Sequence, residues 1–112
     1  MAKPIFTPEQ PAAANFEQLI AVVPGATVSK AILHAFGVRQ VLFAMDAEQE
    51  LTEHTSPSLA TVQVLTGEVD VRVGGTTHEL VPAGWALLPP NVPHAVKAKT
   101  PGIWLLTMIK TD

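Results

Sequence analysis

The sequence contains no cysteine and no tyrosine, and aromatic residues make up only 5% of its 112 residues. The absence of cysteine excludes disulfides, thiolate metal sites and a cysteine nucleophile, and it fits a reducing compartment such as the cytoplasm. No apolar run is long enough to span a membrane, and the first residues, MAKPIFTPEQ, lack the basic and then apolar pattern of a secretory signal. We therefore expect a cytoplasmic protein with no membrane partner.

Charged residues are also few, at 15% of the chain, and the net charge is −3. The lysines and arginines are scattered and form no basic cluster, so we expect no nucleic-acid partner. The chain has no glycine-rich phosphate loop, no nucleophile elbow and no Ser-His-Asp spacing. Its length predicts one domain, residues 1–112, that buries its own core.

The distribution of prolines and of β-branched and apolar residues predicts a chain made of short β-strands. Ten prolines divide the chain, and few windows between them are long enough for a helix. Residues 1–15 predict an irregular arm, and we expect a strand to begin near Phe16. Short segments rich in Val, Thr, Leu and Ile then predict strands at 28–36, 39–45, 60–66, 68–73, 76–80, 85–88, 94–98 and 103–109. Eight such strands in one small domain indicate a β-sandwich, jelly roll or barrel.

The Gly74-Gly75 pair lies between two alternating segments and favours a two-residue hairpin turn. Such a turn fixes the register of the strands on either side of it. The expected cross-strand pairs are Val73 with Thr76, Val71 with His78, and Val69 with Leu80. Asp70 and Glu79 then share the opposite face, which we expect to be solvated.

Two stretches resemble the motifs of the cupins, which are small double-stranded β-helix, or jelly-roll, barrels. The first cupin motif is Gly, five residues, His-x-His, three or four residues, Glu, six residues and Gly. In this sequence the opening Gly falls on Glu48 and the His-x-His pair on His54 and Ser56. The Glu of the motif falls on Ala60 and its last Gly on Gly67.

The second cupin motif is Gly, five residues, Pro-x-Gly, two residues, His, three residues and Asn. Its first Gly falls on Ala83, its Pro on Pro89 and its second Gly on Asn91. Its His falls on His94 and its final Asn on Ala98. The resemblance covers about residues 39–109. It implies an all-β double-stranded β-helix with an N-terminal arm or edge strand.

The resemblance also implies a site with a reduced ligand set. In metal-binding cupins the two first-motif histidines, the glutamate and the second-motif histidine converge on one metal. Only His54 and His94 stand at those positions, and they would hold one divalent transition metal (Zn, Fe, Mn, Ni or Cu). Their nearest nitrogens are then expected about 3–4 Å apart. Ser56 and Ala60 occupy the other two ligand positions and would line the pocket that binds the substrate.

Other donors lie outside the family's ligand positions. Glu50 and Glu53 precede His54, and we favour a solvated loop for residues 48–53. An extended chain there would point Glu53 away from the side of His54. His34 and His78 are expected to be edge or surface histidines without a chemical role.

The residues and the resemblance to cupins leave three functions open. The first is a metal-dependent enzyme that activates dioxygen, or an isomerase or lyase that acts on a small organic acid. The second is a small-molecule binding or sensing module without metal or catalysis, in which His54, His94 and Ser56 orient the ligand. The third is a structural role with a vestigial site. Small cupins usually form homodimers, often by exchanging N-terminal segments, and the arm at 1–15 is compatible with that arrangement.

Overall fold

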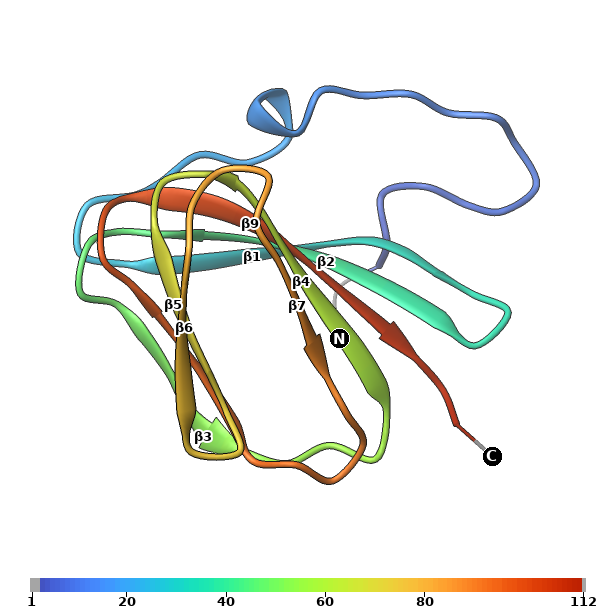
Figure 1. Ribbon diagram of the computed structural model, residues 1–112. Helices are drawn as coiled ribbons and strands as arrows, with labels where there is room; N and C mark the ends of the chain where they lie inside the picture. The colour runs from blue at the N-terminus through green and yellow to red at the C-terminus, as the bar shows by residue number, and fades with distance from the viewer. Residues whose placement is uncertain (1–2, 112) are drawn as a thin grey trace.

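Two antiparallel β-sheets face each other in the computed structural model, which describes residues 3–111 (Figure 1). The five-stranded sheet has the order β1 (Thr27–Ala35), β2 (Val38–Met45), β9 (Gly102–Ile109), β4 (Leu59–Thr66) and β7 (Trp85–Leu88). The four-stranded sheet has the order β3 (Glu50–His54), β8 (His94–Ala98), β5 (Val69–Val73) and β6 (Thr76–Leu80). The all-β prediction is therefore confirmed. None of the helices in the described residues is long and apolar enough to cross a membrane.

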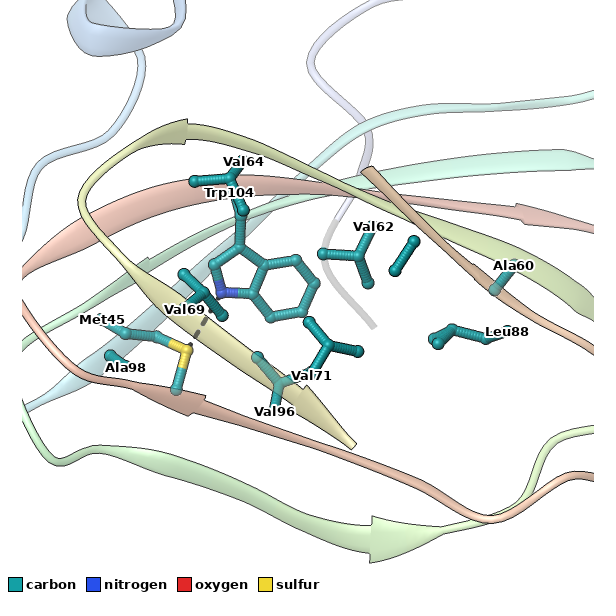
Figure 2. Packing of buried hydrophobic residues seen from close by; sticks show 11 residues of the cluster. Met45, Ala60, Val62, Val64, Val69, Val71, Leu88, Val96, Ala98 and Trp104 are labelled. Atoms are coloured by element: carbon teal, nitrogen blue, oxygen red, sulfur yellow. Dashed lines mark hydrogen bonds between the residues drawn. The ribbon is translucent and has the colours of Figure 1, made fainter. Parts of the chain in front are cut away.

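The main core fills the space between the two sheets, because alternate residues of each strand point inward. Figure 2 shows Val62 and Val64 of β4 facing Val69 and Val71 of β5, with the Trp104 indole of β9 between them. Trp104 is 1% exposed, and its indole Nε1 donates a hydrogen bond to the Met45 sulfur at 3.1 Å. The indole therefore buries its large apolar surface and still has a partner for its only polar group.

The outer face of the five-stranded sheet carries a second apolar cluster, covered by the N-terminal arm. The amides of Ile5 and Phe6 donate hydrogen bonds to the carbonyls of Ala31 and Ile32 in β1, at 3.1 and 2.9 Å. The arm thus occupies the free edge of the sheet. The cluster combines apolar residues that precede β1 with residues of the strands that they cover: Phe6, Phe16, Leu19, Ile20, Val22, Val28, Ile32, Leu42, Ala44, Leu65, Ile103 and Leu105. Strands β2 and β9 are consequently buried on both faces, which explains their continuous apolar runs.

Two predicted elements differ from the structure. The strand expected near Phe16 is wrong, because the chain forms a 3-10 helix there, η1 (Phe16–Gln18). The amides of Leu19 and Ile20 both donate to the Phe16 carbonyl, and this turn lets all three side chains pack on the sheet. The loop expected over residues 48–53 is also wrong from Glu50 on, because β3 pairs with β8 as an edge strand. Glu50 and Glu53 remain exposed, as edge charges commonly do.

The hairpin and the motif positions agree with the structure. Strands β5 and β6 pair in the predicted register, and Gly74 and Gly75 have φ values of 57° and 87°. The four residues that stand at motif glycine positions also have positive φ: Glu48 (70°), Gly67 (78°), Ala83 (73°) and Asn91 (64°). Positive φ is the conformation in which glycine is favoured. The backbone of this chain thus keeps the motif conformation even where the glycine is replaced.

Candidate functional site

His54 and His94 come together at one end of the barrel. His54 ends β3, His94 begins β8, and the two residues are direct partners in the strand register. This is the lower end in Figure 1, where β3 ends beside the β5–β6 turn. The Nε2 atoms lie 3.2 Å apart, and the ring planes meet at 70° with centroids separated by 4.4 Å. The predicted nitrogen–nitrogen distance is therefore confirmed.

A β-bulge in β3 gives His54 its orientation. Leu51 pairs with Val96 and His54 pairs with His94, so three residue steps on β3 oppose two steps on β8. Strict alternation from Leu51 would turn Glu53 inward and His54 outward. The bulge reverses this arrangement, and both Leu51 and His54 border the same cavity. Glu53 instead borders a separate hollow on the outer face of the four-stranded sheet.

Backbone carbonyls fix the tautomer of both imidazoles. The Nδ1 atom of His54 lies 2.9 Å from the Thr52 carbonyl, and that of His94 lies 3.1 Å from the Val92 carbonyl. A carbonyl oxygen only accepts hydrogen bonds, so each Nδ1 carries a hydrogen and donates it. In the neutral rings both Nε2 atoms then carry lone pairs, and these atoms are only 3.2 Å apart. Such a pair is favourable when a cation, either a proton or a metal ion, lies between the nitrogens.

The two histidines differ in exposure. His54 is exposed at the mouth, whereas His94 is 7% exposed and is the only buried polar or charged residue among those described. Burial lowers the pKa of His94 from its usual value, and the neighbouring His54 lowers it further. The hydrogen bond to Val92 opposes this shift. His94 is therefore held in the neutral form, which is the form that binds metal ions.

A cavity of about 100 Å³ begins at the histidine pair and extends between the sheets. Its wall includes Phe43 and Trp104, whose rings are stacked with centroids 4.5 Å apart and planes within 10°. The other lining residues in the part of the chain that the structure describes are apolar: Phe43, Leu51, Val62, Leu88, Val96, Trp104 and Leu106. The arrangement is an apolar pocket with one polar end.

Comparison with known proteins identifies the family. The model of the AraC-like ligand binding domain matches residues 36–112. The chain belongs to this family. Among solved structures, it is similar to a conserved protein of unknown function from Streptococcus pyogenes, at 22% identity and a TM-score of 0.86 over 99% of this chain and 97% of that one. A search of curated proteins gives no significant match.

Two further structures carry the cupin name. A cupin superfamily protein from Desulfitobacterium hafniense is 20% identical, with a TM-score of 0.85 over 98% of this chain and all (100%) of that one. A cupin 2 conserved barrel domain protein from Leptotrichia buccalis is 30% identical, with a TM-score of 0.78 over 83% of this chain and 45% of that one. The double-stranded β-helix predicted from the two motifs is therefore the fold of this AraC-like domain.

Ser56 and Ala60, at the other two ligand positions of the motif, lie outside the lining of the cavity. The Ser56 hydroxyl accepts a hydrogen bond from the Ser58 amide at 3.2 Å, and the Ser56 carbonyl accepts one from Asn91 at 2.7 Å. Ser56 thus ties two loops together at this end of the domain. Ala60 is 4% exposed and belongs to the main core. Their contact with a substrate stays a prediction.

Two imidazoles are the metal donors that the described residues bring together at this site. No group of three or more His, Asp or Glu side chains able to hold a metal occurs within residues 3–111. Glu48 pairs with Lys97 instead, at 3.2 Å, and His34 and His78 are exposed on β1 and β6. Sequence reasoning did not identify the individual residues of this apolar lining, although one signal was available: Val96 follows His94 by two residues and must therefore share its face.

Proposed function

We propose that this domain binds a small molecule in the 100 Å³ cavity and directs the polar group of the ligand to one divalent transition metal held by His54 and His94. The observation that supports this proposal is the pair of Nε2 atoms 3.2 Å apart, each free of a backbone partner. Two nitrogen ligands about 2.0–2.1 Å from one tetrahedral ion lie roughly 3.3 Å from each other. The separation of the two nitrogens therefore matches that of two ligands on one metal ion.

Hydrogen bonds within the protein fix the tautomer of both histidines in the absence of a ligand. The carbonyls of Thr52 and Val92 hold each ring in the Nδ1–H tautomer, so that Nε2 is the donor. A bound metal would supply a Lewis acid with coordination positions open to ligand oxygens. The apolar wall excludes water from the ligand's body and strengthens the electrostatic interaction at the polar end.

A second candidate is a metal-free binding or sensing domain. The specific observation that favours it is the two-residue donor set, since catalytic metals normally have about three protein ligands. In this function His54 and His94 would hold the polar group of the ligand by hydrogen bonds alone. The ligand would then stabilise the protein equally well with and without a chelator.

Calorimetric titration with Zn²⁺, Mn²⁺ and Ni²⁺ separates the two functions. The wild type is expected to bind one ion per chain, and His54→Ala and His94→Ala are expected to weaken binding by roughly tenfold or more. His78→Ala is the matched control, because His78 is exposed on β6, lies outside the lining of the cavity, and is separated from β8 by strand β5. Equal heats in wild type and both site variants would reject the metal site and leave the metal-free function.

We also propose that the protein is a cytoplasmic homodimer, as the cupin resemblance and the absence of cysteine suggest. Sedimentation equilibrium tests the assembly, and fractionation of cells tests the location. A sedimentation mass equal to the 11.9 kDa of one chain would reject the dimer.

A further inference from the structure

The lining of the cavity restricts the chemical class of the ligand. We infer that the site selects a short aliphatic monocarboxylate, with its carboxylate at the histidine pair and its alkyl body between the sheets, and that it rejects polyhydroxylated ligands. This inference rests on the proposed function, because it takes the histidine pair as the polar end of the site.

Hydrogen-bonding capacity inside the cavity is confined to its mouth. Among residues 3–111, nine line the cavity; seven of them are apolar, and the two histidines already use their Nδ1 atoms on backbone carbonyls. The indole Nε1 of Trp104, the other polar group of the lining side chains, donates to the Met45 sulfur. A hydroxyl group on the body of a ligand would therefore lose its water without gaining a partner.

The charge of the mouth favours an anionic head. Within residues 3–111 no Asp or Glu side chain lines the cavity, so none of these carboxylates competes for a cation between the Nε2 atoms. A cation held by two neutral imidazoles keeps its full positive charge. A carboxylate is a suitable oxygen donor for it and supplies the compensating charge.

The volume limits the body of the ligand. A cavity of about 150 Å³ lined by Leu, Ile and Phe side chains is known to accept benzene. The cavity here is smaller, at about 100 Å³, and the stacked rings of Phe43 and Trp104 form part of its wall. It thus accommodates an alkyl chain of about three to five carbons. The exposed His54 places the head at the mouth, and Trp104, which is 1% exposed, marks the deep end.

Valerate and 4-hydroxybutyrate are the probes that test this inference. They share length and charge and differ only in a terminal methyl or hydroxyl group, which lies too far from the carboxylate to chelate a metal strongly. The protein is the Zn²⁺-loaded Trp85→Phe variant, in which Trp104 is the remaining tryptophan and reports binding by fluorescence. The dissociation constant of valerate is expected to be lower than that of 4-hydroxybutyrate by a factor of about ten or more.

Two substitutions locate the bound probe. Leu51→Phe adds bulk to a half-buried lining residue on the edge strand, and it should abolish the response to valerate while Zn²⁺ binding remains. Leu87→Phe is the matched control, since Leu87 is 44% exposed and lies outside the lining. If circular dichroism shows that Leu51→Phe is unfolded, Leu106→Phe replaces it, at another half-buried position of the lining.

The outcomes separate this inference from the proposed function. Equal affinity for the two probes, or a response to valerate that Leu51→Phe does not change, would overturn the ligand class. Zn²⁺ binding without any response to valerate would overturn it as well, and would leave the metal site standing. A preference for valerate that persists in the presence of a chelator would support the aliphatic ligand class. It would contradict the claim that a metal ion at the histidine pair binds the carboxylate.

Discussion

Gly67 lies where the turn between β4 and β5 meets the chain that enters β9, and replacing it with alanine should be strongly destabilising. Its φ is +78°, which disfavours alanine by about 1–2 kcal/mol. An added Cβ would also collide with the Pro101 carbonyl oxygen and lie 2.7 Å from the Gly102 Cα. Both are backbone atoms and cannot rotate away, so overpacking adds about 1–3 kcal/mol. We expect Gly67→Ala to lower the free energy of unfolding by about 2–5 kcal/mol.

Urea denaturation followed by circular dichroism measures this loss, and Gly25→Ala is the control. Gly25 has a similar φ of +71°, but an added Cβ there would meet no atom within 4 Å. Its loss should therefore be about 1–2 kcal/mol, from the backbone conformation alone. Equal losses in the two variants would refute the reasoning, because the close approach of Gly67 to Pro101 would then contribute nothing.

Three other outcomes follow from the same structure. Ala83→Gly relieves a positive φ of 73° and should raise the free energy of unfolding by roughly 0.5–1 kcal/mol in urea denaturation, whereas a loss would contradict the assigned conformation. Phe6→Ala removes a half-buried ring that packs the arm against the outer face of the sheet. It should lower the free energy of unfolding by roughly 2 kcal/mol and the melting temperature by several degrees. An unchanged melting temperature would show that the arm does not cover this face. In the metal-free folded protein the pKa of His94 is lowered, so as the pH falls the unfolded chain binds a proton at this residue before the folded protein does. The contribution of neutral His94 to the free energy of unfolding is therefore fully present above the unfolded pKa of about 6.5 and is lost as the pH falls below that value. His94→Gln should make the free energy of unfolding less dependent on pH between pH 8 and pH 5. An equally steep dependence in the variant would show that a group other than His94 binds the proton responsible.

Much of the fold could be predicted from local patterns. Short segments rich in Val, Thr, Leu and Ile located eight of the strands, because the strands of a two-sheet barrel bury one face or both. The Gly74-Gly75 pair gave the register of β5 and β6, since a two-residue turn leaves one choice of pairing. The motif spacing likewise predicted the approach of His54 to His94 across 40 residues of sequence.

The missed features depend on contacts between distant segments. Strand β3 carries exposed charges on an edge, so its own sequence shows no buried face, and only its pairing with β8 makes it a strand. The bulge after Leu51 has no local signal, yet it decides that His54 rather than Glu53 faces the cavity. The turn at Phe16 is likewise imposed by the apolar sheet face on which it packs.

Anomalous diffraction tests the central claim most directly. Crystals of the wild-type protein grown with Zn²⁺ would be measured on both sides of the zinc absorption edge. We predict one anomalous peak between the imidazoles, about 2.0–2.1 Å from the Nε2 atoms of both His54 and His94. A map without a peak there, or histidine rings that point away from each other, would contradict the assignment of this pair as the metal site.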